Sequence, residues 1–267
     1  MRSITKLCIL SAALLLVFTA TSCKLMDQLK AREHLNQGVK AYTSKKYDEA
    51  VEEFKAAIEK DSALVDAYLY LAAAYRAQFV PLAPSPENLR KGQEAIATFE
   101  QVLELDPQST NAMANIADLY RNMGEPDKAK DWYRKLMEIS EEKAQALYGL
   151  ASIDYNLADE KTGSDGSNVE NLTEEELAEV NRVVEEGMDA LRQALEIQPD
   201  YTDAMEYLNL LYREKAELAV DDDEERRRWQ NEADKLALEA LEKKRQLQRE
   251  AERARRQMFT GEGDSPE

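Results

Sequence analysis

The stretch from Lys45 to Tyr75, KKYDEAVEEFKAAIEKDSALVDAYLYLAAAY, decides the fold. On either side of Asp61-Ser62, apolar and aromatic residues recur at three- and four-residue spacings, which places each series on one face of an α-helix. The stretch therefore predicts two amphipathic helices joined by a tight turn, and similar spacing down the chain indicates a repeat protein. The two series are Tyr47, Ala50, Phe54, Ala57, Ile58 and Tyr68, Leu71, Ala72, Tyr75.

Composition favours an all-helical protein. The 267 residues include only 9 Gly and 7 Pro, and 43% are hydrophobic, which is enough to form a buried core. The formal net charge of -18 repels nucleic acid phosphates and anionic lipid head groups wherever no local basic patch offsets it. We therefore expect no nucleic acid partner.

The amino end has the pattern of a secretory targeting segment, which we assign to residues 1–22. Arg2 and Lys6 precede an apolar run of about 14 residues, a length that suits a signal peptide better than a membrane-spanning helix. Ala20-Thr21-Ser22-Cys23 then resembles a bacterial lipobox. This resemblance implies cleavage before Cys23, a diacylglycerol on its thiol and acylation of its new amino group.

Lipidation at Cys23 also accounts for the cysteine content. Cys8 lies inside the segment that would be removed, so the mature chain would keep one cysteine and form no internal disulfide. Several acyl chains anchor a protein stably. Because Lys24, and not Asp, follows Cys23, we expect a lipoprotein of the outer membrane that faces the periplasm. The alternatives are an ordinary secretory signal with an incidental cysteine, or an uncut membrane anchor.

From residue 31 the spacing resembles the tetratricopeptide repeat, a helix-turn-helix unit of about 34 residues. The best matches in the second and third units are Tyr68, Leu71, Ala72, Tyr75, Ala95, Phe99, Ile116, Ala117, Tyr120 and Ala129. The resemblance implies an all-α fold, a right-handed α-α superhelix of about five units with a long C-terminal helix. The expected units are 31–64, 65–109, 110–143, 144–201 and 202–242.

Other segments fall outside this repeat pattern. An insert at 79–90 contains Pro81, Pro84 and Pro86, which we expect to forbid helix and to lengthen a turn. A second insert, over 157–172, contains a polar loop from Asp159 to Asn171, after which Thr173 and Glu176 predict a capping box. The remaining segments are a lead-in at 23–30, a basic helix extension at 243–258 and a tail at 259–267 that we expect to be disordered.

The sequence contains no recognisable catalytic or metal-binding constellation. His34 is the one histidine, and it occupies a helix packing position without a cysteine or second histidine to join it. The acidic run at Asp221-Asp222-Asp223 suits a helix amino end better than a calcium loop, because it lacks the required glycine and alternating spacing. We therefore predict that the protein is not an enzyme and has no cofactor or metal.

In the resembled family, the first helix of each unit lines a concave groove that binds a partner segment. Asn and Arg side chains there can hydrogen-bond an extended backbone, and Tyr rings supply rigid contact area. A merely solvated helix face is the alternative for each position. The candidate groove residues are Tyr42, Arg76, Asn111, Asp118, Arg121, Asn122, Gln145, Tyr148, Tyr155, Asn156 and Arg213.

The last helix is a second candidate interaction surface. From Leu241 to Met258, seven Lys or Arg stand against three acids. This segment is either a solvated charged helix or a surface for an acidic partner, a coiled-coil mate or anionic lipid. In build the chain is similar to tetratricopeptide lipoproteins of outer-membrane assembly and pilus biogenesis. We therefore expect a lipid-anchored protein-protein interaction scaffold, with an oligomerising structural protein as the alternative.

Overall fold

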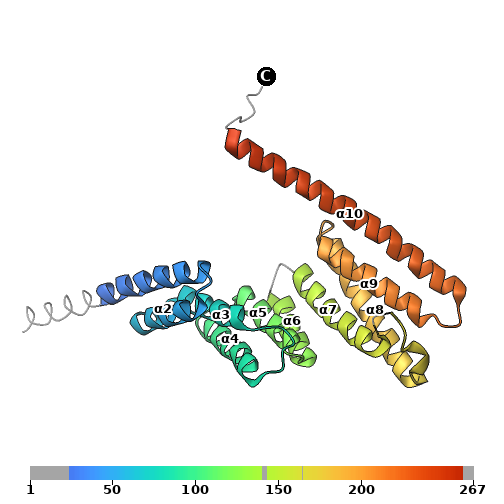
Figure 1. Ribbon diagram of the computed structural model, residues 1–267, viewed down its shortest axis with the longest axis horizontal. Coiled ribbons are helices and arrows are strands. Elements are labelled where there is room, and N and C mark those ends of the chain that lie inside the picture. The colour runs from blue at the N-terminus through green and yellow to red at the C-terminus, as the bar shows by residue number, and fades with distance from the viewer. Residues whose placement is uncertain (1–23, 140–142, 164, 261–267) are drawn as a thin grey trace, which may run out of the picture. The chain divides into compact units, whose positions relative to one another are not determined.

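The computed structural model describes residues 24–139, 143–163 and 165–260, and these ranges are helical apart from their turns and loops (Figure 1). The expected signal peptide and Cys23 lie outside the described residues, as do residues 261–267 of the expected tail. The chain divides into two compact units, Met1–Trp132 and Tyr133–Glu267, which we call unit 1 and unit 2.

Unit 1 is built from successive helices joined by short turns. The helix over residues 24–43 precedes α2, and α2 packs on α3, α3 on α4 and α4 on α5. α6 (Pro126–Ile139) begins in unit 1 and ends in unit 2. The other bounds are α2 (Tyr47–Lys60), α3 (Val65–Gln78), α4 (Pro86–Leu105) and α5 (Thr110–Asn122).

Unit 2 has the same paired arrangement. α7 packs on both α8 and α9, and α9 packs on both α8 and α10. Thr173 caps α8 with the predicted capping box, because its hydroxyl accepts from the backbone N of Glu176 while the Glu176 carboxylate accepts from the backbone N of Thr173. The bounds are α7 (Lys143–Thr162), a 3-10 turn (Val169–Asn171), α8 (Glu174–Ile197), α9 (Thr202–Leu218) and α10 (Asp223–Thr260).

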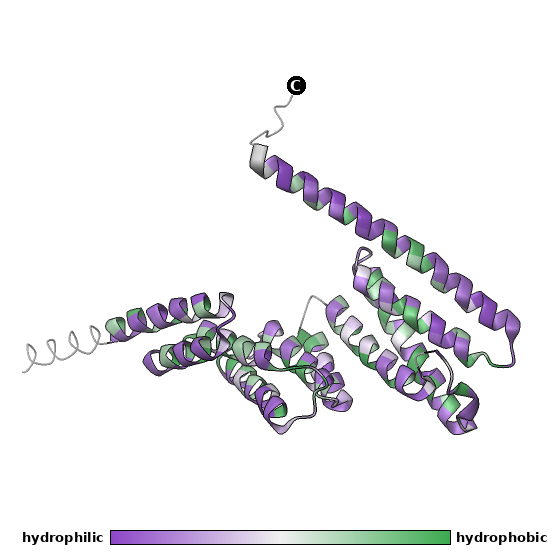
Figure 2. Ribbon diagram, in the orientation of Figure 1, coloured by the Kyte–Doolittle hydropathy of each residue, from purple (hydrophilic) through white to green (hydrophobic). Residues whose placement is uncertain are grey.

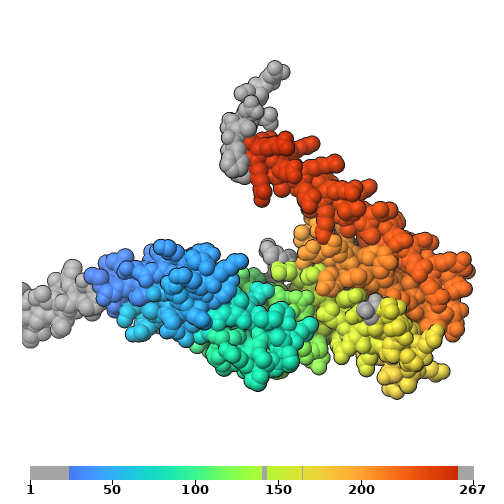
Figure 3. Space-filling model, viewed as in Figure 1, coloured from blue at the N-terminus to red at the C-terminus, as the bar shows by residue number. Residues whose placement is uncertain are grey.

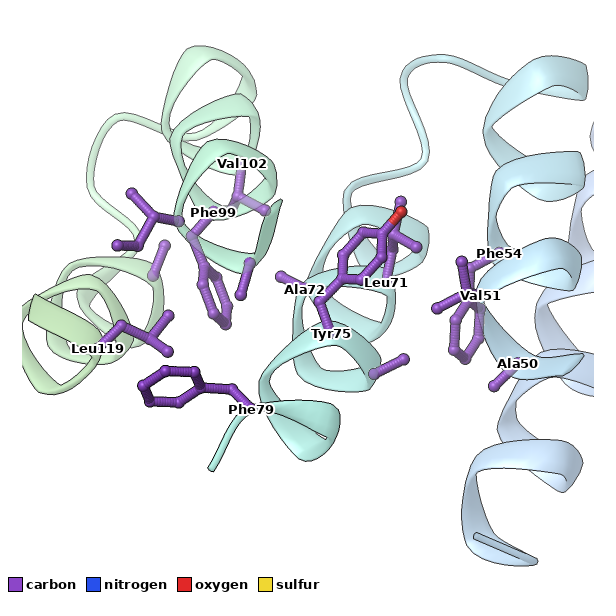
Figure 4. Close-up of a cluster of buried hydrophobic side chains, with 14 of the residues drawn as sticks. Ala50, Val51, Phe54, Leu71, Ala72, Tyr75, Phe79, Phe99, Val102 and Leu119 are labelled. Carbon is purple, nitrogen blue, oxygen red and sulfur yellow. The ribbon is translucent and has the colours of Figure 1, made fainter. Parts of the chain in front are cut away.

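The core of unit 1 confirms the pattern of the 45–75 stretch. Phe54 of α2 and Leu71 and Tyr75 of α3 are buried between the helices, and Phe99 of α4 continues the cluster toward α5 (Figure 4). Alanines such as Ala72 fill the narrow positions between these larger side chains. Small residues allow adjacent helices to approach closely, and the aromatic rings fill the remaining space.

In both inserts the non-helical loop is shorter than the sequence predicts, because a neighbouring helix extends into the insert. α4 begins at Pro86 with Ser85 as its N-cap, because proline is compatible with the first helical position, where its missing N–H has no partner to lose. The prediction that 79–90 forms a loop is therefore wrong for residues 86–90, which belong to α4. α7 likewise continues through Thr162, so the polar loop does not begin at Asp159.

The remaining loop before α4 is held by Asn88. The backbone N of Val80 donates to Asn88 Oδ1 at 2.6 Å, and Asn88 Nδ2 donates to the carbonyl oxygens of Val80 and Ala83, each at 2.8 Å. Asn88 is itself nearly buried. The loop thus satisfies its backbone groups through one α4 side chain.

We expect Gly38→Ala to lower the free energy of unfolding by about 1–3 kcal/mol through overpacking. An added Cβ would lie 2.5 Å from Phe54 Cε1, and Phe54 is fully buried. The loss should occur although alanine favours helix over glycine by about 1 kcal/mol. Urea unfolding measures the effect, with the exposed neighbour Asn36→Ala as control. A Gly38→Ala protein as stable as the parent would contradict this packing.

Unit 2 buries the carboxyl group of Glu214 on α9. Its side chain is 4% exposed and accepts a hydrogen bond from Thr162 Oγ1 at 2.9 Å. Burial is the main cause that raises the pKa of Glu214 from 4.5 to about 7, with repulsion from Glu217 and Asp159 acting in the same direction against the Thr162 hydrogen bond. Ionisation of Glu214 therefore costs folding free energy.

The buried carboxyl makes stability depend on pH. Between pH 4.5 and about 7 the unfolded chain loses this proton while the folded chain keeps it, so the contribution of Glu214 falls as pH rises through that window. We expect Glu214→Gln to stabilise the protein by about 2 kcal/mol at pH 8 and to be near neutral at pH 4.5. Thermal unfolding at both pH values measures this, and an equal effect at the two would contradict the burial of an ionisable group here.

Candidate protein-interaction site

Four tyrosines of unit 2, which we call the tyrosine cluster, meet where α7 packs on α9. Tyr148 and Tyr155 are seven residues apart and so lie on one face of α7. Tyr207 of α9 stands between them, with ring centroids 5.1 Å from Tyr148 and 5.7 Å from Tyr155, both edge to face. Tyr201, just before α9, lies 5.3 Å from Tyr148. All four rings are partly exposed, so they form an ordered aromatic surface.

The surroundings of the tyrosine cluster are negatively charged. Burial is the main cause that raises the pKa of Tyr155 to about 12, and Asp159, Glu214, Tyr207 and Glu217 add to it electrostatically. Burial and the charges of Asp165 and Asp159 also raise the pKa of Glu217. An aromatic surface with carboxylates beside it attracts cations, through the ring faces and through the charges.

The other predicted residues of α7 flank this cluster. Gln145 and Asn156 are exposed, and their helical positions lie to one side of the Tyr148–Tyr155 line. Tyr201 and Tyr207 were not predicted from the sequence. Tyr207 is the sixth residue of the repeat 202–242, whereas the repeat pattern counts the second, fifth, ninth, twelfth and thirteenth residues as groove-lining.

Unit 1 carries a polar network on α3 and α5. Arg76 donates to Asn115 Oδ1 and lies 3.9 Å from Asp118 Oδ2, while Arg121 donates to Asp118 Oδ1 at 3.0 Å. Asn115 Nδ2 also donates to the carbonyl oxygen of Asn111 at 2.8 Å. Asn115 thus links Arg76 to Asn111, and Arg76 in turn approaches Asp118 and its partner Arg121. The sequence analysis missed Asn115, which is again the sixth residue of its repeat, here 110–143.

The remaining predicted residues have other surroundings. Tyr42 is partly buried against the unit 1 core and contacts Tyr47 edge to face at 5.5 Å. The carbonyl oxygen of Asn122 accepts from the backbone N of Leu82 at 3.0 Å. Arg213 donates to Asp234 of α10 at 3.0 Å, so its guanidinium joins two packed helices.

His34 and the acidic run at Asp221-Asp222-Asp223, which were considered as candidates for catalysis or metal binding, have structural partners. His34 Nδ1 lies 2.8 Å from Glu53 Oε2, which ties the 24–43 helix to α2. Asp222 Oδ1 accepts from the backbone N of Glu224 and of Glu225 at the start of α10, as an N-cap carboxylate does. Over the ranges that the structure describes, His, Cys, Asp and Glu form no group suited to hold a metal ion. Nor is any helix in those ranges long and apolar enough to cross a membrane.

Comparison with known proteins identifies the repeats. Two tetratricopeptide repeat family models match, one over residues 66–109 and the other over residues 90–153. No curated protein matches the chain by sequence.

Solved structures of tetratricopeptide type share the fold. The chain is similar to a crystal structure of MamA protein at 16% identity and a TM-score of 0.54, over 89% of this chain and 98% of that one. A second MamA crystal structure has 18% identity and a TM-score of 0.52, over 79% and 96%. MamA 41-end from Desulfovibrio magneticus RS-1 has 16% identity and a TM-score of 0.53, over 81% and 96%. The predicted all-α tetratricopeptide solenoid is confirmed.

Proposed function

We propose that the protein is a non-catalytic interaction scaffold, lipid-anchored through Cys23 in a bacterial cell envelope, which binds a segment of a partner protein on the first helices of its repeats. Tetratricopeptide repeats mediate protein-protein contacts, and the family models match residues 66–109 and 90–153. The tyrosine cluster is the observation that carries the proposal, because it supplies preformed aromatic contact area on α7 and α9.

The chemistry of the cluster favours a basic partner segment. Tyrosine is enriched among the residues that contribute most to protein interfaces, because it offers a large rigid ring and a hydroxyl. Here the carboxylates of Asp159 and Glu217 near Tyr155 also favour a Lys or Arg side chain over the rings. A segment with Lys or Arg between apolar residues fits this surface.

The polar network of unit 1 supplies a different kind of contact. Asn111 and Asn115 present hydrogen-bonded amide groups one turn apart on α5, and Arg121 presents a guanidinium paired with Asp118 further along the same helix. Such groups can bond to the peptide backbone of an extended segment and so add affinity with little dependence on its sequence. We assign backbone recognition to this network and side-chain selection to the tyrosine cluster.

The start of the described chain supports membrane attachment. Leu25, Met26 and Leu29 follow Cys23 closely and are 60%, 53% and 56% exposed. Exposed large apolar residues are costly in water and favourable at a bilayer surface. Their position beside the proposed lipid suggests that this turn of helix lies against the membrane.

Site-specific crosslinking tests the binding proposal in native cells. A photoreactive residue at Asn156, beside the cluster, should capture a discrete partner, and one at the exposed Gln193 of α8 should not. Tyr155→Ala should reduce the capture about tenfold, since loss of a central interface tyrosine commonly costs more than 1 kcal/mol. Circular dichroism controls for folding. Equal capture from both positions, or capture that survives Tyr155→Ala, would argue against this surface.

Substitution of the two cysteines tests the lipid anchor. Cys23→Ser should abolish incorporation of labelled palmitate and leave the 1–22 segment uncleaved, because the thiol is the acceptor of the lipid. Cys8→Ser is the matched control and should change neither, since that residue lies within the segment to be removed. Intact-mass analysis and membrane fractionation provide the readout. Lipid labelling that persists in Cys23→Ser would refute the anchor.

A further inference from the structure

α10 is far longer than the helix on which it packs. It has 38 residues, against 17 in α9. Its first part packs on α9, where Ala233 and Ala240 are buried. Two ion pairs also join the helices, Asp234 with Arg213 and Lys244 with Glu206. The side chains of residues 245–257 are all exposed, and the C-terminal part of α10 extends past the end of α9 (Figure 1 and Figure 3). We call residues 245–257 the projecting segment.

The apolar face that packs on α9 continues along the projecting segment. Leu247, Ala251 and Ala254 follow Ala240 by seven, eleven and fourteen residues, which places all three within about 40° of it around the helix. These three side chains are exposed, Leu247 at 36%. In Figure 2 the same stretch is otherwise hydrophilic. The segment thus extends an established helix interface beyond the end of its partner.

The projecting segment is also positively charged. Residues 245–257 contain five Arg and two Glu, in a chain with a formal net charge of -18. Arg245, Arg249 and Arg253 follow one another at four-residue steps, a spacing at which like charges destabilise a helix. Among the described residues no carboxylate forms an ion pair with these three, whereas Arg182 and Arg192 of α8 are both paired within their helix.

We propose that the projecting segment is the docking site for an acidic amphipathic helix of a partner protein, which packs on Leu247, Ala251 and Ala254 in line with α9. Small side chains at two of these positions allow another helix to approach closely. Lys243 and Arg255 flank the stripe, where they would meet acidic residues as Lys244 meets Glu206. The arginine row adds long-range attraction for a negative partner.

Two other occupants fit the segment less well. The same segment of a second copy would bring together two strongly positive helices, which repel. Insertion of the stripe formed by Leu247, Ala251 and Ala254 into a bilayer would be only weakly favourable, because Leu247 is its one large apolar residue with a described side chain. A helix lying on a membrane by this stripe would also hold Arg245, Arg249 and Arg253 on its far side, away from the head groups.

Binding of designed peptides to the intact protein tests the proposal. One amphipathic peptide of about 20 residues carries Leu and Ala on one face and Glu beside them, and its match has Lys at every Glu position. The acidic peptide should bind in a fluorescence anisotropy titration, and its affinity should fall as salt is added. The lysine peptide should not bind. Equal binding of both peptides, or of neither, would overturn the proposal.

Variants of α10 locate the contact. Leu247→Gln with Ala254→Gln should weaken acidic-peptide binding about tenfold or more, because the buried apolar contact is lost. Gln246→Ala, on another face, should leave it unchanged. Unaltered binding by the first variant would refute the stripe.

The parent protein and the α10 variants also test whether a second copy of the chain or a bilayer occupies the segment. Light scattering reports self-association, and flotation with vesicles of phosphatidylglycerol reports lipid binding. If either is present and is lost with Leu247→Gln and Ala254→Gln, that occupant replaces the acidic helix.

Discussion

The close approach of paired helices at small residues is the constraint on which the structure depends. In unit 1, Gly38 leaves room for the ring of Phe54, and in unit 2, Gly187 of α8 faces Leu211 of α9 and Asp154 of α7. An added Cβ at Gly187 would lie 2.9 Å from Leu211 Cδ1 and 3.1 Å from Asp154 Cβ. One glycine therefore determines how closely α8 packs against both α7 and α9.

The tyrosine cluster follows from this packing. Because α7 and α9 both pack on α8 and also on each other, Tyr148 and Tyr155 of one helix reach Tyr207 of the other. The same contact buries Glu214 against Thr162, close enough to Tyr155 to contribute to the rise in the pKa of that tyrosine. Ionisation of Glu214 at this position costs folding free energy, so the packing of α7 on α9 is more stable below about pH 7 than above it.

Sequence spacing predicted the helix pairs and the unit 1 core well, because burial follows a helical period that can be counted in residues. It wrongly predicted a loop at Pro86, because proline disrupts a helix interior but is accepted in the first turn, where α4 has it. It placed Tyr148 and Tyr155 on one face of their helix but missed Tyr207 and Asn115, whose contacts depend on the neighbouring helix. Arg213 shows the same limit, because its pairing with Asp234 depends on where α10 lies.

The uninterrupted length of α10 gives its basic charge a definite direction. A flexible basic tail on so acidic a chain would be drawn back onto the protein's own carboxylates. Residues 223–260 contain neither Gly nor Pro, so the helix continues without a break after its contact with α9. Thirteen residues of helix extend about 20 Å, well beyond the length of a side chain. The rigid backbone therefore holds the arginines away from the acidic surface of α9 and leaves them accessible to another molecule.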